Sequence, residues 1–391
     1  MKKKQILFIE TYATVTIYKM ARLLRKKGYE TILLRLLKPN DSDINFYNNA
    51  YDKIIYFNLI KQENFQNLKK ISSSLIKIYN LKPYVIFGRS NPNKMIFLFR
   101  LFFRKIPFIY YPYDIRFHYT LRRFAKKERG FSKIEMFSEK YNFEHSQGII
   151  HKGAPEELDE IHERIGKTKL PKNILTFHSY CSDEFIIPLN KKKLSKKDGK
   201  IHLVYVGSGN PQRKEYEEYL EFSKPLINQE IHMHFYMASN TLINKKIVNE
   251  FLKDKKKTKN INYFHIHNQL DPKKIIKEIS KYDFGLSLTD PLLTTGYSKY
   301  DLEPRYQLGN KFMSYLEAGI PFFSGKRFTF MNKLMKKYNL EIIYPELNKI
   351  KQFIKNLNYK ELEKNIEKAR KDFNMEKHFP ELEEFIKKVA Q

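Results

Sequence analysis

Cysteine is almost absent from this sequence: Cys181 is the only one among 391 residues. A single thiol excludes an internal disulfide framework and any metal site built from several cysteines, and it suits a reducing compartment. Long hydrophobic runs are also missing. The longest, MIFLFRLFF at residues 95–103, has about half the length of a spanning helix, and Arg100 interrupts it. We therefore expect a cytoplasmic protein, soluble or peripheral on the inner face of the cytoplasmic membrane.

A secretory signal peptide is not expected at the N-terminus. The start, MKKKQILFIE, is basic, but the apolar run that follows has only about five residues and fits a buried strand better. Self-similarity at periods of 20–50 residues is absent, which argues against a solenoid. A chain of 391 residues with 42% hydrophobic content predicts a folded protein with two domains.

Acidic residues are scarce relative to basic ones: 43 Asp and Glu face 73 Lys and Arg, a net charge of +30. A basic surface attracts nucleic acids and anionic lipids alike. Only 15 of the basic residues are Arg, and the abundance of Lys, Asn and Ile indicates AT-rich coding that adds Lys to every surface. Zinc-finger spacing, RNP-like strands and basic-zipper patterns are absent. We expect no nucleic-acid partner and keep an anionic membrane surface as a partner.

Short β-branched runs alternate with helical periodicity in both halves of the chain, a pattern typical of βαβ units and parallel sheets. The first half holds six or seven such runs, at 5–10, 31–37, 52–57, 84–88, 107–114, 148–153 and 173–177. The second half restarts at 200–207 and continues at 232–238, 261–267, 283–288 and 321–325. The pattern predicts an α/β fold of two doubly wound Rossmann-like domains that face each other across a cleft.

The charged segment LNKKKLSKKDGK at 189–200 is the best linker candidate. It separates an N-terminal domain at 1–188 from a C-terminal domain at 201–374, and a helix at 375–391 is expected to pack back on the N-terminal domain. The apolar helix at 95–105 has two interpretations. It is either a crossover helix packed on the sheet or a membrane-docking helix with basic residues at its edge.

A helix is predicted to begin at Asn310, with Lys311 in its first turn. Its first turn presents unpaired backbone N–H groups and the positive end of the helix dipole. A cation is unfavourable there, so its presence suggests an anionic ligand such as a diphosphate, although a surface lysine is the alternative.

The segment GNKFMSYLEAGIPFFSG at 309–325 resembles the donor-site signature of the group 1 glycosyltransferases, N-K-x-x-E-Y-x-x-A-G-x-P. Six positions match: Asn310, Lys311, Tyr315, Ala318, Gly319 and Pro321. Other segments, among them HLVYVGSGN and PFIYYPYD, are similar to segments of the same families and occur in the same order. The resemblance implies the GT-B architecture, with acceptor binding in the N-terminal domain and nucleotide-sugar binding in the C-terminal domain.

The Gly-rich turn Gly207-Ser208-Gly209 follows a predicted strand and is able to approach phosphate oxygens. Related transferases often carry cations a few residues further on, and Arg213 and Lys214 occupy that spacing. These cations would stabilise a leaving nucleotide diphosphate, and a solvated helix start is the alternative. The one Asp-x-Asp spacing, at residues 41–43, lies in an N-terminal loop. We therefore predict metal-independent chemistry with no cofactor.

The match to the signature is incomplete. Ser314 stands where the family places a Glu that holds the ribose, and Glu317 lies three residues further along the helix. An earlier Glu of the family falls at Tyr306. We predict donor contacts from Ser314, Tyr315 and Glu317, with core packing as the alternative for Tyr315, and the nucleotide base stays open.

Acceptor contacts are expected in the N-terminal loops. Thr11, Tyr12 and Thr14 follow the first strand and, with Arg116, are the predicted acceptor-binding residues. Asp114 ends the fifth strand and His118 follows it. The two are the predicted catalytic pair, because a carboxylate and an imidazole there can bind hydroxyls or transfer protons, and ordinary loop packing is the alternative for both.

Histidines alternate along two predicted strands, and each pair shares one strand face: His232 with His234, and His265 with His267. We expect no carboxylate or cysteine to complete a metal-ligand set, so a polar strand face is preferred and no metal site is predicted. His151, at another strand end, is a further candidate for a functional role.

The sequence thus predicts a glycosyltransferase that moves a sugar from a nucleotide-sugar donor to a hydroxyl of a glycan or lipid-linked saccharide. The resemblance implies retention of anomeric configuration and a role in polysaccharide biosynthesis for the cell envelope. Three alternatives stay open: a catalytically silent scaffold subunit that binds sugar nucleotides, suggested by Ser314, a GT-B nucleotide-sugar epimerase, and a polyol-phosphate transferase.

Overall fold

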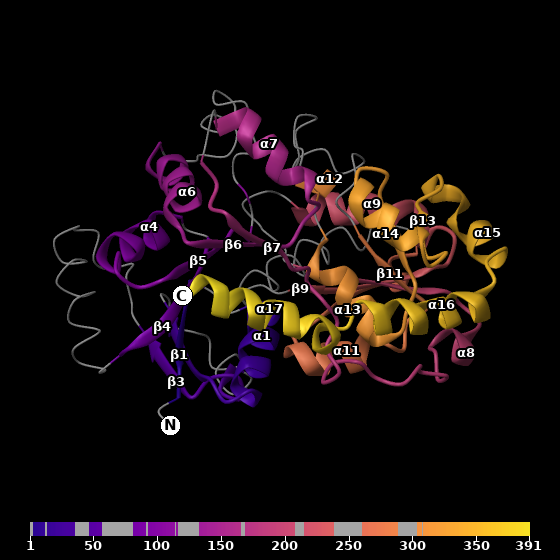
Figure 1. Cartoon of the computed structure of the whole chain (residues 1–391). Coiled ribbons are helices and arrows are strands. Elements are labelled where there is room, and N and C mark those ends of the chain that lie inside the picture. The colour runs from indigo at the N-terminus through magenta and orange to yellow at the C-terminus, as the bar shows by residue number, and fades with distance from the viewer. Residues whose placement is uncertain are drawn as a thin grey trace. The chain divides into compact units, whose positions relative to one another are not determined.

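The computed structural model describes residues 3–11, 14–35, 47–56, 81–90, 93–113, 115, 133–165, 169–207, 215–237, 260–287, 303–306 and 308–391. The chain forms two compact units, Met1–Ser179 with Met375–Gln391, and Tyr180–Asn374 (Figure 1). Each unit is a parallel sheet with flanking helices, so the predicted α/β fold with two Rossmann-like domains is confirmed.

The first unit contains a seven-stranded sheet in the order β3-β2-β1-β4-β5-β6-β7. Its strands are β1 (Gln5–Glu10), β2 (Glu30–Arg35), β3 (Lys53–Tyr56), β4 (Pro83–Arg89), β5 (Phe108–Tyr111), β6 (Gly148–His151) and β7 (Asn173–Thr176). The strand order reverses between β1 and β4, which is where open α/β sheets bind ligands, at the carboxyl ends of the strands.

Helices α1 (Val15–Lys26), α4 (Asn93–Phe102), α6 (Lys133–His145), α7 (Glu156–Ile165) and α17 (Met375–Val389) belong to this unit. α17, at the yellow end of the colour scale in Figure 1, packs on α1 and β7. A Cβ on Gly148 would lie 2.6 Å from a methyl of Val389, so only glycine permits this close approach to β6.

The apolar helix α4 is a crossover helix packed on the sheet. Met95, Ile96 and Phe99 are buried in the core of the unit, and Arg100 donates from Nε to the carbonyl oxygen of His145 at 2.8 Å. The interpretation of this helix as a membrane-docking element is therefore wrong, because its apolar side chains already cover the sheet. Across the described segments, none of the helices combines the length and apolarity that crossing a bilayer requires.

The second unit contains a six-stranded sheet in the order β10-β9-β8-β11-β12-β13. Its strands are β8 (His202–Gly207), β9 (His232–Met237), β10 (Phe264–His267), β11 (Phe284–Leu286), β12 (Phe322–Ser324) and β13 (Ile342–Ile343). Its α-helices are α8 (Ser195–Asp198), α9 (Glu215–Ile227), α11 (Pro272–Ile279), α12 (Glu303–Tyr306), α13 (Asn310–Ala318), α14 (Thr329–Lys336), α15 (Ile350–Lys355) and α16 (Tyr359–Asp372).

The charged segment at 189–200 lies inside this second unit and is anchored to it. Lys193 is buried, and its Nζ donates to the carbonyl oxygens of Ser280 at 2.8 Å and Tyr282 at 3.0 Å. The segment contains α8, which ends at Gly199 in the left-handed conformation that favours glycine at a helix C-terminus.

Candidate functional site

Helix α13 is fixed against the ends of strands β8 and β11 by one side chain. Tyr315 is fully buried, and its hydroxyl donates to the carbonyl oxygen of Leu286 at 2.8 Å and accepts from the N–H of Val206 at 3.2 Å. Burial raises the pKa of Tyr315, so the hydroxyl stays protonated and keeps this donor role. The first turn of α13 is thereby held near the carboxyl edge of the sheet.

Gly285 on β11 leaves the space that the Tyr315 ring fills. A Cβ at Gly285 would lie 2.5 Å from Cγ of Tyr315, well inside any real contact. Because Cγ is the ring atom nearest the backbone, the side chain cannot swing away without moving α13. The glycine and the tyrosine are therefore a matched pair that sets how closely the helix approaches the strand.

Lys311, in the first turn of α13, reaches the carboxyl end of β8. Its Nζ lies 4.6 Å from the centre of the Tyr205 ring and 3.4 Å from the Tyr205 hydroxyl oxygen. The same ring covers Gly207, where a Cβ would meet the Tyr205 hydroxyl oxygen at 2.4 Å. We refer to Tyr205, Gly207, Asn310 and Lys311 as the β8–α13 corner. It brings together a helix N-terminus, a cation and a side-chain-free strand end, which suits an anionic group.

Two further predicted donor residues, Ser314 and Glu317, have partners within the unit. The Ser314 hydroxyl donates to the carbonyl oxygen of Asn310 at 3.3 Å, one turn earlier in α13. Glu317 is buried, and its Oε1 accepts from the N–H of Ser182 at 3.0 Å. It lies seven residues after Asn310, about 10 Å along the helix axis. Tyr315 and Glu317 therefore hold α13 in place, whereas Asn310 and Lys311 lie at its N-terminal end.

Several predicted site residues lie outside the described residues. They are Tyr12, Asp114, Arg116, His118, Ser208, Gly209, Arg213 and Lys214. Their roles stay predictions. Among the described donor-site predictions, the structure brings together Gly207, Asn310 and Lys311, and it adds Tyr205, which sequence analysis missed because the residue sits inside an apolar strand.

A second polar cluster lies in the first unit, where β1 ends. Glu10 is fully buried, and its Oε2 accepts from the N–H of Thr14 at 3.2 Å and from the Thr14 hydroxyl at 3.3 Å. The Tyr51 hydroxyl donates to its Oε1 at 3.4 Å. Burial raises the pKa of Glu10 to about 7, although the charge of Arg89 lowers it. A carboxyl group that titrates near neutrality can exchange protons at the working pH.

The predicted acceptor residues Thr11 and Thr14 adjoin this carboxyl group in the chain, and Thr14 binds it directly. Glu10 was not predicted from the sequence, because it ends an otherwise apolar run, QILFIE, and a strand terminus predicts no particular chemistry. The sequence did contain one indication of a functional role: Glu10 is a charged residue at the carboxyl end of a buried parallel strand, where such sheets bind ligands.

Two cations flank one aromatic ring at the ends of β4, β5 and β6. The guanidinium carbon of Arg89 lies 4.0 Å from the centre of the Tyr113 ring, and Nζ of Lys152 lies 3.7 Å from it. The N–H of Tyr113 donates to the hydroxyl of Ser90 at 2.8 Å. Both cations are buried, so positive charge is concentrated beneath this sheet edge. Neither Arg89 nor Lys152 was predicted from the sequence, although each stands at or directly after a strand end.

His151, the further candidate, is buried and paired inside the unit. Its Nε2 is bonded to the carboxylate of Glu157 on α7. His178, after β7, donates from Nδ1 to the carbonyl oxygen of Lys152 at 2.7 Å, and burial lowers the pKa of its ring. Both imidazoles therefore form hydrogen bonds within the first unit, near the carboxyl edge of its sheet.

No protein-family model matches the chain, and no curated protein sequence is significantly similar to it. Solved structures are similar over nearly the whole length. Sucrose-phosphate synthase from Thermosynechococcus elongatus has a TM-score of 0.71 at 12% identity, with 99% of both chains covered. Anabaena HepE in complex with UDP and glucose has a TM-score of 0.68 at 11% identity, covering 98% of this chain and 100% of HepE.

A Listeria monocytogenes structure assigned as a UDP-N-acetylglucosamine 2-epimerase has a TM-score of 0.55 at 12% identity, covering 95% of this chain and 93% of that one. At such identities the likeness concerns the fold. The expected resemblance is thus confirmed at that level: the chain has the GT-B fold of two Rossmann-like domains, which it shares with solved glycosyltransferases.

Proposed function

We propose that this protein is a glycosyltransferase that uses a UDP-sugar and transfers the sugar to a hydroxyl of a glycan or lipid-linked saccharide. One observation carries the proposal: Lys311, at the N-terminus of α13, lies beside Tyr205 and Gly207 at the carboxyl end of β8. That corner offers the backbone N–H groups of a helix N-terminus and a cation held by an aromatic ring on one GT-B domain.

In the proposed reaction the bond between the anomeric carbon and the diphosphate oxygen breaks, and the acceptor hydroxyl forms the new bond. Negative charge develops on the departing diphosphate, so Lys311 and the helix dipole stabilise the transition state more than the ground state. Gly207, Asn310 and Lys311 are the proposed donor contacts, joined by Ser208, Gly209, Arg213 and Lys214 from the sequence prediction. This arrangement supports transfer without a metal, and retention of configuration follows from the group 1 resemblance.

The base is proposed to be uracil because Anabaena HepE, which has the same fold, was solved with UDP and glucose. The sequence left the base open, since Ser314 replaces the glutamate that the family uses for ribose. The proposed contacts to the diphosphate therefore account for the affinity for UDP. The shared fold is the reason for proposing uracil as the base.

The acceptor is proposed to bind at the polar edge of the first unit. Thr11 and Thr14 supply hydroxyls there, and Glu10 supplies a carboxyl group with a pKa of about 7. Asp114, Arg116 and His118 keep their predicted roles, and Glu10 joins them as a candidate proton acceptor. The cations Arg89 and Lys152 on Tyr113 support an acceptor that carries phosphate, as a lipid-linked saccharide does.

A peripheral membrane contact is proposed through α6 rather than α4. Ile134 and Phe137 on α6 are 53% and 57% exposed, and Lys133 and Lys94 are exposed nearby. Apolar side chains with cations around them suit an anionic bilayer surface. Cosedimentation with phosphatidylglycerol vesicles tests this contact: Phe137→Ser is expected to reduce the bound fraction, and an unchanged fraction would contradict it.

Two alternatives keep specific support. The Listeria structure shares the fold and is assigned as an epimerase, and Ser314 at the family's glutamate position favours a scaffold subunit that binds donor without turnover. An epimerase would convert the sugar nucleotide with no acceptor present. A scaffold would bind UDP tightly and release none from any sugar nucleotide.

The test is a turnover assay on purified protein with a panel of UDP-sugars, with and without lipid-linked and glycan acceptors, and with and without Mg²⁺. The proposal expects acceptor-dependent UDP release that persists without Mg²⁺ and falls about tenfold or more in Lys311→Ala. Lys364→Ala, an exposed position on α16, is the matched control and should behave as the unchanged protein. Sugar conversion without acceptor would favour the epimerase, and binding without turnover would favour the scaffold.

A further inference from the structure

Five histidines share one face of the neighbouring strands β8, β9 and β10, and we call them the imidazole ladder: His202, His232, His234, His265 and His267. Residues two apart in a strand point to the same side of a sheet. His202 is paired with His232 in the sheet register, and His234 with His265. The rings of His202 and His232 stack with centres 4.4 Å apart and planes 8° apart.

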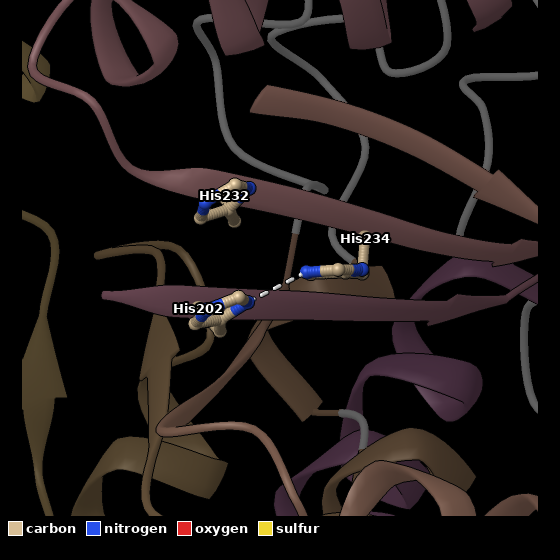
Figure 2. Close-up of side chains that lie close together, drawn as sticks. All are labelled: His202, His232 and His234. Carbon is tan, nitrogen blue, oxygen red and sulfur yellow. Dashed lines mark hydrogen bonds between the residues drawn. The ribbon is translucent and has the colours of Figure 1, made fainter. Parts of the chain in front are cut away.

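Hydrogen bonds run diagonally through the ladder, and each joins an Nδ1 to an Nε2. His202 Nδ1 lies 2.9 Å from His234 Nε2, the bond drawn in Figure 2. His234 Nδ1 lies 2.9 Å from His267 Nε2, and His232 Nδ1 lies 2.8 Å from His265 Nε2. A neutral imidazole has one donor and one acceptor nitrogen, so all these bonds can be satisfied with neutral rings.

Both rows of the ladder end at one carboxylate. Oδ2 of Asp198 lies 3.0 Å from Nε2 of His202 and 3.5 Å from Nε2 of His232. The expectation that no carboxylate accompanies these histidines is therefore wrong. Asp198 was hidden in the charged segment, and the left-handed turn at Gly199 folds it back toward the start of β8.

We propose that Nε2 of His202, Nε2 of His232 and Oδ2 of Asp198 form a binding site for Zn²⁺ or a similar divalent transition metal. Bonds of about 2.0–2.1 Å to a tetrahedral zinc place its ligand atoms about 3.3 Å apart. The two measured separations, 3.0 and 3.5 Å, lie on either side of that value. The two rings stack in parallel with centres 4.4 Å apart, so binding one ion requires them to turn toward each other.

A third imidazole stands close to the proposed ligands. One nitrogen each from His202, His232 and His234 lie within 4.8 Å of one another. Both nitrogens of His234 are bonded to other rings of the ladder, so it supports the ligands and does not bind the ion itself. Two imidazoles and one carboxylate are a donor set that suits zinc, copper or nickel, while magnesium and calcium prefer oxygen donors. The nitrogen donors of the site therefore favour a transition metal over magnesium or calcium.

The remaining ladder already supplies partners for both ligand rings. When Nε2 holds the metal, the ring proton moves to Nδ1, which then donates to the next imidazole in the row. His202 would donate to His234, and His232 would donate to His265, over the same 2.9 and 2.8 Å separations. Metal binding thus reverses the direction of these hydrogen bonds without breaking them, and His234 and His265 are positioning residues.

Solvent has access to the site from the Asp198 side. The side chains of Asp198 and His232 are 42% and 16% exposed, and that of His202 is 6% exposed. The site lies at the first residues of β8 and β9, whereas Gly207 ends β8 five residues later, about 17 Å away. The metal would therefore fasten α8 to the sheet and take no part in sugar transfer, so the inference stands or falls separately from the proposed function.

Zinc titration by calorimetry on tag-free, EDTA-stripped full-length protein tests the site. We expect one equivalent of Zn²⁺ to bind and to raise the thermal midpoint. Asp198→Asn and His232→Gln should each weaken binding about tenfold or more, and His265→Gln by up to about tenfold through lost positioning. His378→Gln, which removes an unrelated histidine on α17, should leave the affinity unchanged.

Cobalt provides a readout that does not depend on any variant folding. Co²⁺ bound in the proposed set should give intense visible d–d absorption typical of a tetrahedral site, and Zn²⁺ should displace it. Absence of one-equivalent zinc binding and of the cobalt spectrum in the unchanged protein would overturn the proposal. Undiminished zinc affinity in the folded double variant Asp198→Asn/His232→Gln would overturn it as well.

Discussion

Nζ of Lys311 lies 4.6 Å from the centre of the Tyr205 ring, which ties the first turn of α13 to the carboxyl end of β8. The ring face attracts the ammonium group and limits where it can go. A helix dipole alone would disfavour a cation at this position. The tyrosine therefore helps to keep Lys311 where an anionic ligand would complete the arrangement.

Gly207→Ala is predicted to disturb this pair. The added Cβ would lie 2.4 Å from the Tyr205 hydroxyl oxygen and 2.6 Å from the ring carbon that carries it, so the ring must move and take Lys311 with it. We expect UDP affinity to fall several-fold, with about 1 kcal/mol lost from the free energy of unfolding. Calorimetry and chemical denaturation measure the two effects, and unchanged affinity would show that the corner does not depend on the Tyr205 position.

Gly285→Ala should be more damaging to stability than other glycine changes nearby. Its Cβ would meet Cγ of the fully buried Tyr315 at 2.5 Å, so α13 must shift. We expect a loss of about 1–3 kcal/mol in urea unfolding, typical of overpacking. Gly309→Ala is the matched control, since its Cβ would be at an ordinary 3.5 Å from Phe312. Equal costs for the two changes would contradict the matched fit of Gly285 and Tyr315.

Glu317 is predicted to act in stability and not in donor affinity. Glu317→Ala leaves the buried N–H of Ser182 without this acceptor and should cost about 1–3 kcal/mol. Glu317→Gln keeps an acceptor oxygen and should cost less. UDP affinity should stay unchanged in Glu317→Gln. A tenfold loss of affinity in that variant would instead support the donor contact that the family resemblance implied.

Stability of the first unit should depend on pH through Glu10. Unfolded, this carboxyl group has the ordinary pKa of 4.5, whereas burial raises the pKa to about 7 in the folded protein. Between these values the unfolded chain holds fewer protons, so raising the pH favours unfolding. The contribution of Glu10 is fully present below pH 4.5 and is lost as the pH rises through 7, a change of roughly 3 kcal/mol.

Glu10→Gln cannot titrate and should remove that dependence. Thermal unfolding of both proteins from pH 4.5 to pH 8 measures the difference in their stability at each pH. Groups that titrate in both proteins contribute equally to the two curves, so the difference reports on Glu10. The variant should gain stability relative to the unchanged protein as the pH rises. Parallel curves over the whole range would show that Glu10 titrates normally.

Local patterns in the sequence predicted the strands of both sheets except β13, which has only two residues, Ile342 and Ile343. Apolar runs such as QILFIE and HLVYVG became β1 and β8, because strands buried on both faces need continuous apolar residues. The motif around Asn310 and Lys311 predicted α13 and its first-turn cation correctly, since helix starts are encoded locally.

Contacts between side chains that only the folded chain brings together could not be predicted in the same way. Glu10 ends β1 and Tyr205 lies within β8, and their chemistry arises from Thr14, Arg89 and Lys311, which the fold brings to them. Asp198 lay in a segment that looked like a linker until the turn at Gly199 placed it beside two histidines. Such contacts depend on long-range packing, which periodicity does not reveal.

Calorimetric titration of UDP, without Mg²⁺, into the unchanged protein, Lys311→Ala and Lys364→Ala tests the central claim most directly. The account predicts that UDP binds the unchanged protein and Lys364→Ala equally, and binds Lys311→Ala about tenfold or more weakly, a loss of about 1.4 kcal/mol or more. Failure of UDP to bind the unchanged protein, or equal affinity in all three, would contradict a donor site at the β8–α13 corner.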